Sequence, residues 1–284
     1  MKDEAAVDGR WFDIRNRRAM VSLGPLSPKR FCTYACAFCY VHVDFESYPS
    51  LPVEQIVGYL RDRVGEFDIV YVSGDTDSLA PPRTEKGLEL IDSLAGLGTD
   101  VLFTTRAPLD EHHLDRLASI SHKLKEQGKI LFGCVSISRL RSAPHLEPRP
   151  VPTPERRLEV LRGLHERGIA SILAMRPFLP VIPAAEYVEL ADLAKPFVDV
   201  ILGEVWYADK EGVLEKQVFG TAGPTGLVFE EHKMDFDSND AIWKVWEGTD
   251  VRVSVEAYCA RANIPFYMRS GPAVEYIRSI RSPA

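Results

Sequence analysis

The stretch FCTYACAFCY, residues 31–40, contains three of the five cysteines of this 284-residue chain, namely Cys32, Cys36 and Cys39. The spacing C-x3-C-x2-C brings three thiolates onto one short loop, and thiolates are the preferred ligands of soft metal centres. Three thiolates can hold three irons of a four-iron cluster and leave the fourth iron open to another ligand. We therefore predict that these cysteines bind a [4Fe–4S] cluster.

Two other interpretations of the cysteines have to be weighed. A structural zinc site is the main competitor, because His42 follows Cys39 by three positions and would complete a Cys3His set. Such sites more often combine two separated pairs of ligands than one short run. A disulfide framework does not fit an odd number of cysteines behind an N-terminus without a signal-peptide core. A non-enzymatic zinc or iron–sulfur protein stays open as an alternative.

The composition limits the possible partners. The chain is 45% hydrophobic and 26% charged, which is ordinary for a globular protein, and its formal net charge is −7. That balance gives no general attraction for phosphate backbones, so nucleic acid is an unlikely partner. No apolar run approaches the roughly 20 residues that cross a bilayer. We expect no membrane association and a reducing cytoplasm, which suits free thiolates and an oxygen-sensitive cluster.

The hydrophobic pattern predicts alternating strands and helices. Six short apolar runs read as strands, and each is followed by residues at helical spacing or by turn residues. The runs cover residues 19–23, 68–73, 101–105, 130–137, 172–175 and 198–202. This alternation predicts an α/β fold, a partial (β/α)6 TIM-like barrel. We expect one domain over 1–284, with a lead-in (1–30), a barrel core (31–202) and a C-terminal extension (203–284) that closes the barrel mouth. Within that extension, helices are expected near 239–247 and 254–261.

Polar residues follow several of the predicted strands. In such folds the chemistry collects where the parallel strands end. The cysteine loop follows the first strand, and the polar residues that follow the later strands are Ser73, Gly74, Asp75, Arg106, Ser136, Ser138, Arg141 and Arg176. Taken singly, each of these is equally explained as a turn, a helix cap or a solvated loop.

The cysteine spacing, with an aromatic residue before the third cysteine, resembles the signature of the radical S-adenosylmethionine (SAM) superfamily. The sequence from Ser73 to Ser78 with Pro81-Pro82, and Glu147-Pro148-Arg149-Pro150 leading to residues 154–158, resemble its spore photoproduct lyase-like branch. The resemblance covers roughly residues 30–180. It implies a radical SAM enzyme, with SAM as second cofactor at the open iron and an electron donor such as flavodoxin or ferredoxin. It also implies a 5′-deoxyadenosyl radical that abstracts a hydrogen atom from the substrate.

The resemblance also suggests roles for the residues at the strand ends. Ser73, Gly74 and Asp75 occupy the place of a motif that binds the methionyl amino group of SAM. Ser136, Ser138 and Arg141 would serve the ribose and the carboxylate. Arg106 and Arg176 are further anion contacts. The aromatic residues of the loop, Tyr34, Phe38 and Tyr40, would pack near the adenine or the cluster.

The substrate is the least defined part of the prediction. The lyase proper repairs a thymine dimer and uses a cysteine with nearby tyrosines, but this chain has no cysteine between Cys39 and Cys134. We therefore expect a small-molecule or peptide substrate, with a lyase-like action on nucleic acid as the alternative. Cys134, Tyr258 and Cys259 are the candidates for a hydrogen donor or a pocket wall. The extension adds acidic and aromatic residues that would suit a polar or cationic molecule, namely Glu204, Trp206, Tyr207, Asp209, Tyr258 and Tyr267.

Overall fold

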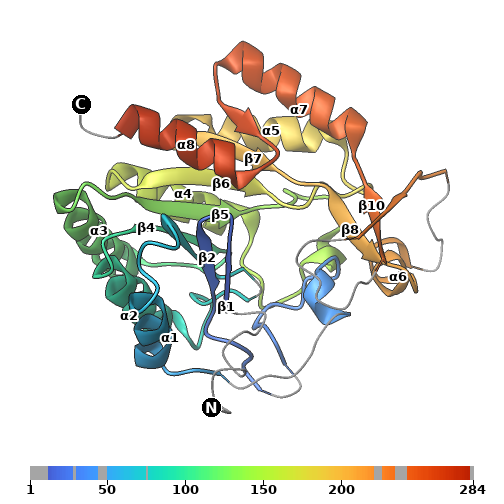
Figure 1. Ribbon diagram of the computed structural model, residues 1–284. Helices are drawn as coiled ribbons and strands as arrows, with labels where there is room; N and C mark the ends of the chain where they lie inside the picture. The colour runs from blue at the N-terminus through green and yellow to red at the C-terminus, as the bar shows by residue number, and fades with distance from the viewer. Residues whose placement is uncertain are drawn as a thin grey trace.

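The computed structural model describes residues 12–27, 30–43, 50–74, 76–220, 226–233 and 242–281. In these residues the main sheet has eight strands in the order β1-β2-β3-β4-β5-β6-β7-β11 (Figure 1). The strand β1 is antiparallel to β2, and all later neighbours are parallel. Their bounds are β1 Phe12–Arg15, β2 Arg18–Val21, β3 Ile69–Val72, β4 Asp100–Thr105, β5 Leu131–Ser136, β6 Ala170–Met175, β7 Val200–Gly203 and β11 Phe266–Tyr267.

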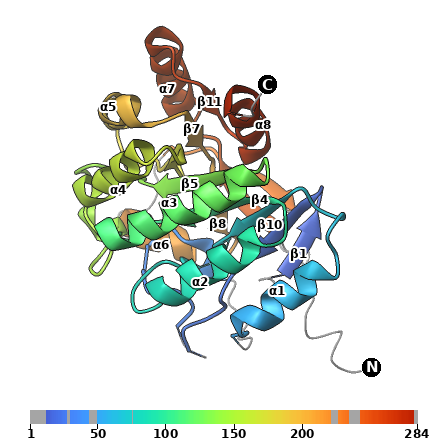
Figure 2. The ribbon, with the colours of Figure 1, turned by 90° about the vertical axis from the view of Figure 1, so that its left-hand side faces the viewer.

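Five helices follow one another along the outer face of this sheet (Figure 2). Each turns an apolar stripe towards the strands; in α3, for example, Leu114, Leu117, Ile120 and Leu124 are buried at helical spacing. The helix begins where the Asp110 carboxylate accepts a hydrogen bond from the backbone N–H of His113. The five helices are α1 Val53–Arg61, α2 Thr84–Ala95, α3 Glu111–Glu126, α4 Pro154–Glu166 and α5 Ala184–Ala194.

The six predicted strands are confirmed as β2 to β7, with small shifts at their ends. The α/β partial barrel is confirmed as well, and it stays open, because β1 and β11 are the edges of the sheet. The strands β1 and β11 were not predicted. The helix expected near 239–247 is wrong in its described part, since residues 242–246 form β10 (Ile242–Trp246), whose side chains alternate in burial as in a strand with one covered face.

The C-terminal extension is divided between the mouth of the barrel, the outer layer of helices and the inner face of the sheet. Directly after β7, the strands β8 (Trp206–Asp209), β10 and β9 (Glu230–Lys233) form a second sheet, accompanied by α6 (Val213–Phe219). This sheet begins where the parallel strands end, which is the mouth of the barrel. The helix α7 (Thr249–Ala262) packs against α5. Only the first of these parts covers the mouth.

The last helix, α8 (Ser270–Arg281), fills the inner face of the sheet. Its Ala273, Val274 and Ile277 are buried against inward-facing strand residues. Near its end, Arg278 Nε donates to Asp100 Oδ2 at 2.6 Å, and Arg281 pairs with Asp199 at 2.9 Å. Both aspartates lie where their strands begin, so α8 anchors at the end of the barrel opposite the mouth (Figure 1).

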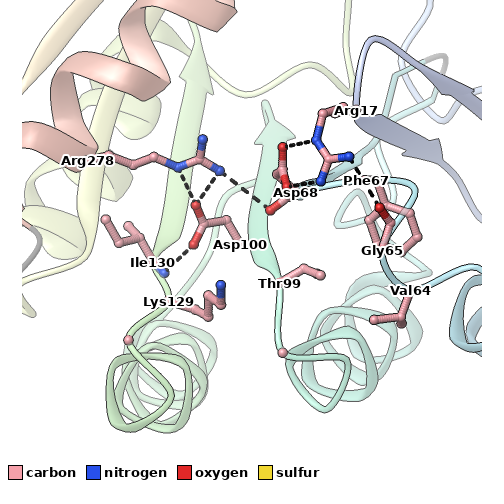
Figure 3. A pocket seen from close by; sticks show the side chains of 12 residues that line it. Arg17, Val64, Gly65, Phe67, Asp68, Thr99, Asp100, Lys129, Ile130 and Arg278 are labelled. Carbon is pink, nitrogen blue, oxygen red and sulfur yellow. Dashed lines mark hydrogen bonds and ion pairs between the residues drawn. The ribbon is translucent and has the colours of Figure 1, made fainter.

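A hollow of about 440 Å³ lies at this lower end (Figure 3). Charged side chains that line it form two ion pairs, Arg17 with Asp68 and Arg278 with Asp100. In barrel enzymes this end of the strands serves stability, whereas reactions occur at the mouth. The hollow therefore belongs to the anchoring of α8 and β1 and not to the reaction.

Replacing Ile277 by alanine should lower the free energy of unfolding by about 2–5 kcal/mol, because a fully buried side chain at the barrel interior would leave a cavity. Urea unfolding followed by circular dichroism measures the change. The matched control is Ile280→Ala on the same helix, where the side chain is 51% exposed and the expected change is within about 0.5 kcal/mol. Equal effects of the two substitutions would contradict the placement of α8 inside the barrel.

Candidate functional site

The cysteine loop is tied by its backbone to three other parts of the chain at the barrel mouth. Its Ala37 N–H donates to the carbonyl of Leu146 at 2.9 Å. The Phe31 carbonyl accepts from Thr76 Oγ1 at 3.4 Å, which joins the loop to the segment after β3. From β8, Trp206 Nε1 donates to the Phe38 carbonyl at 3.4 Å. The backbone of the loop is thus fixed from three directions.

The three thiols of this loop lie close enough to influence one another. Cys36 is buried, while Cys32 and Cys39 are half-buried. Burial raises the pKa of the Cys36 thiol to about 12; the charge of Arg106 opposes this rise, and Glu147 and the other two cysteines add to it. The backbone N–H of Tyr34 donates to Cys32 Sγ at 3.4 Å. Since a buried thiolate is unfavourable by itself, Cys36 requires a cation or a metal centre to ionise.

The arrangement of the cysteines bears on the kind of metal centre that they could hold. In the described part of the chain, no three histidine, cysteine or acidic side chains are grouped so that they could hold one ion. The side chain of His42, which would complete the zinc set, lies outside the described residues. In an iron–sulfur cluster each thiolate binds a different iron, so the cysteines need not converge on one point.

A buried charge network lies next to the cysteine loop. The carboxylate of Glu147 is fully buried and is surrounded by Arg157, whose Nη1 lies 2.9 Å from Oε1, by Arg106 at 3.5 Å and by Arg139 at 3.4 Å. Arg157 also donates to the Ser136 carbonyl at 2.8 Å. Burial alone would raise the pKa of Glu147, but the charge and hydrogen bonds of Arg157, with the other two arginines, hold it below its usual value.

Arg106 connects this network to the cysteines. Its guanidinium carbon lies 5.7 Å from the centre of the Phe38 ring, and its backbone N–H donates to Asp77 Oδ2 at 2.6 Å. Asp77 also accepts from the Thr105 hydroxyl and the Leu79 N–H. Burial would lower the pKa of Arg106, but Cys36, Glu147 and further negative groups raise it. Asp77 is thereby saturated with donors and acts as a positioning group for Arg106.

The surroundings of the thiols carry an excess of positive charge. Three guanidinium groups surround the one carboxylate of Glu147, which Arg106 and Arg139 approach through their Nε atoms. The hydroxyl of Tyr34 is buried without a hydrogen-bond partner among the described residues. Thiolate ligands beside surplus guanidinium charge and a buried hydroxyl without a partner suit an anionic iron–sulfur centre and an anionic ligand group. The residues present therefore fit the predicted cofactors.

The segment after β3 also reaches the mouth. Ser73 has a positive φ of 74°, and its hydroxyl accepts from the Ser78 N–H at 2.9 Å, which folds the segment back on itself. A Cβ atom at Gly74 would lie 2.9 Å from Met20 Cε, so the chain passes close to β2 there. Asp75 lies outside the described residues. The hydroxyl of Ser138 donates to the Arg176 carbonyl at 2.6 Å, so this predicted cofactor contact is engaged with backbone.

Three predicted site residues lie elsewhere. The guanidinium of Arg141 is paired with Glu189 on α5, on the outer surface. Tyr258 on α7 donates its hydroxyl to Asp192 of α5, and Cys259 is buried in the packing of α7. The structure does not bring these three side chains together with the cysteine loop. Cys134, in contrast, faces the barrel interior. Burial raises the pKa of its thiol, and among the charged groups Arg176 opposes this rise most.

Sequence reasoning gave no role to Glu147 or Arg157. A signal for Arg157 existed, because it occupies the apolar stripe of α4 with Val160, Leu161 and Leu164. A charged residue on a buried helix face requires a buried partner, and Glu147 is that partner. Glu147 is part of the motif that resembles the lyase-like branch, but nothing in the sequence of that loop indicated that its carboxylate would be buried among arginines.

Comparisons with known proteins agree with this geometry. The family model of the radical SAM superfamily matches residues 26–194. Among solved structures, spore photoproduct lyase complexed with a dinucleoside spore photoproduct superposes with a TM-score of 0.63 at 14% identity, covering 90% of this chain and 78% of that one. The radical SAM methyltransferase TsrM from Kitasatospora setae gives a TM-score of 0.53 at 14% identity, covering 80% of this chain and 50% of that one. No curated protein matches the sequence.

At these identities the solved structures establish a shared fold, and the family model establishes the relationship. It spans the cysteine loop and the strands β3 to β6. The non-enzymatic alternative is thereby set aside. The chain belongs to the radical SAM superfamily and is a radical SAM enzyme.

Proposed function

We propose that Cys32, Cys36 and Cys39 hold a [4Fe–4S] cluster at which SAM binds and is reductively cleaved. The observation that best supports this proposal is that three thiols lie on one loop, next to three guanidinium groups that surround the single carboxylate of Glu147. When bound, the cluster and SAM supply a 5′-deoxyadenosyl radical that takes a hydrogen atom from a substrate. A small molecule or a peptide is the proposed substrate, with flavodoxin or ferredoxin as electron donor.

The protein's own contribution is to position ligands and to exclude water. Arg106, held by Asp77 and Glu147, supplies a fixed positive charge next to the thiols. The proposed contacts to SAM at the strand ends are Ser73, Gly74 and Ser136. Asp75 is also a proposed contact, and this proposal rests on the sequence alone. Tyr34, Phe38 and Tyr40 form the aromatic surroundings. Trp243 of β10 contacts Tyr40 edge-on at 6.1 Å, so the second sheet shields this side of the loop from solvent.

Replacing Cys36 by alanine should abolish iron incorporation and the formation of 5′-deoxyadenosine, because one of three iron ligands is lost. The measurement is anaerobic reconstitution with iron and sulfide, iron and sulfide analysis, and mass spectrometry after addition of SAM and dithionite. Cys259→Ala is the matched control, since a buried cysteine of α7 should leave the iron content unchanged. Zinc bound without sulfide in the wild type, or unchanged iron in Cys36→Ala, would refute the assignment.

Arg106→Gln should shift the midpoint potential of the reconstituted cluster to a more negative value, because a buried positive charge next to the cysteines favours the reduced, more anionic state. Arg106→Lys, which keeps the charge, should fall between the glutamine variant and the wild type. A redox titration followed by electron paramagnetic resonance gives the potentials. The exposed Arg61→Gln serves as control, and a glutamine variant that titrates like this control would show that Arg106 does not act on the cluster.

A nucleic-acid substrate is the second candidate, and the fold shared with spore photoproduct lyase is the observation that favours it. The net charge of −7 opposes it. We expect no binding of a thymine-rich oligonucleotide by fluorescence anisotropy at micromolar protein. Binding that weakens steeply between about 50 and 200 mM salt would instead support the nucleic-acid reading.

A further inference from the structure

Two charged side chains at the barrel mouth have no hydrogen-bond or ion-pair partner among the described residues. Arg176 directly follows β6 and Glu204 directly follows β7, and the residues before them, Met175 and Gly203, are paired in the strand register. The backbones stay together there, since Phe178 N–H donates to the Glu204 carbonyl at 2.8 Å. Arg176 and Glu204 are thus neighbours at equivalent positions of adjacent strands.

Strand alternation directs both side chains to the barrel interior. Ile172 and Ala174 of β6, and Val200 and Leu202 of β7, belong to the inner apolar cluster that α8 fills. Because side chains alternate along a strand, positions 176 and 204 continue the same inner face one step further towards the mouth. Beneath them the interior is apolar, so it offers neither residue an opposite charge.

The two opposite charges nevertheless form no ion pair with each other. In the described part of the chain, the side chains of Arg176 and Glu204 make no hydrogen bond or ion pair, and Arg176 Nε is buried without a partner. Both residues are only partly exposed. Unpaired charges in such a position are unfavourable unless a ligand completes them.

The same two charges surround two further polar groups. Arg176 and Glu204 both act on the Cys134 thiol and on the Tyr207 phenol of β8. Burial, together with the charge of Glu204, raises the pKa of Tyr207 to about 12, so its phenol stays protonated at neutral pH. Four side chains from β5, β6, β7 and β8 or their ends therefore adjoin one region at the mouth.

We propose that Arg176 and Glu204 form the substrate subsite and hold a zwitterionic small molecule, whose simplest form is a free α-amino acid. The guanidinium receives the carboxylate through its paired N–H donors, and the carboxylate of Glu204 receives the ammonium. This inference rests on the proposed function and narrows its substrate class. It replaces the sequence-based expectation that Arg176 contacts the cofactor.

The methionyl end of SAM is also an α-amino acid, so the pair could in principle bind SAM and not the substrate. The positions of Arg106 and Arg176 distinguish these two ligands. The guanidinium of Arg106 lies 5.7 Å from the centre of the Phe38 ring, in the cysteine loop, whereas Arg176 directly follows β6 and lies beside Glu204 after β7. The Arg106 side chain donates from Nη2 to the Arg176 carbonyl at 3.3 Å, so it is engaged with the Arg176 backbone and leaves the Arg176 guanidinium to another ligand. SAM belongs on the Arg106 side and the substrate on the Arg176 side.

The test is binding of each of the standard free L-amino acids to the anaerobically reconstituted protein with SAM present, by isothermal titration calorimetry. At least one amino acid should bind. Its N-acetyl form, which lacks the ammonium, and its amide, which lacks the carboxylate, should each bind at least about tenfold more weakly. Arg176→Gln and Glu204→Gln should show the same loss for the free amino acid. Arg61→Gln and Glu89→Gln, on the exposed faces of α1 and α2, are the matched controls and should bind like the wild type.

Several outcomes would overturn the proposal. These are the absence of binding by any free amino acid, equal binding of the blocked forms, or a loss of SAM affinity in the two variants, which would assign the pair to the methionyl end of SAM. If a variant does not fold, the blocked forms on the wild type decide alone. Cluster content and 5′-deoxyadenosine are measured in the same samples. A protein without a cluster fails the proposed function, and one with a cluster that binds no zwitterion fails this inference only.

Discussion

The buried carboxylate of Glu147 holds together the mouth of the barrel, where the cysteine loop lies. A fully buried carboxylate is stable only with opposite charges and hydrogen bonds around it, and Arg106, Arg139 and Arg157 provide them. These arginines come from the end of β4, the loop after β5 and helix α4. One residue before Glu147, the Leu146 carbonyl holds the cysteine loop. The same contact set therefore fixes the strand ends, the helix and the loop relative to one another.

The charge balance of this network explains why it suits the site. Three arginines against the two carboxylates of Glu147 and Asp77 leave a positive remainder, which a structural network would ordinarily avoid. Next to three cysteines this surplus positive charge is stabilising, because thiolates and the iron–sulfur centre that they bind are anionic. The apolar interior below, filled by α8, keeps solvent away from the lower side of the mouth. The charges where the strands begin are paired with each other, whereas those where the strands end leave a positive remainder.

Much of the fold could be predicted from the sequence, because parallel strands buried on both faces appear as continuous apolar runs. The three cysteines were equally visible, since their spacing is local. β10 was missed because its alternation of Trp243 and Val245 with half-buried neighbours has the period of a strand but is only five residues long. The side-chain partners of Arg141 and Tyr258 could not be predicted, because Glu189 and Asp192 lie on α5 and sequence spacing carries no information about such contacts.

The anchoring of α8 has a consequence for the order of folding. The bond from Arg278 to Asp100 joins residues 178 apart in sequence, and the bond to the Asp68 carbonyl spans 210. Contacts over such distances form only after the intervening chain has closed a long loop, which slows their formation. The outer helices pack through far more local contacts. We infer that the sheet and its outer layer assemble first, and that the inner face stays uncovered until α8 arrives, which makes this face the vulnerable surface of a partly folded chain.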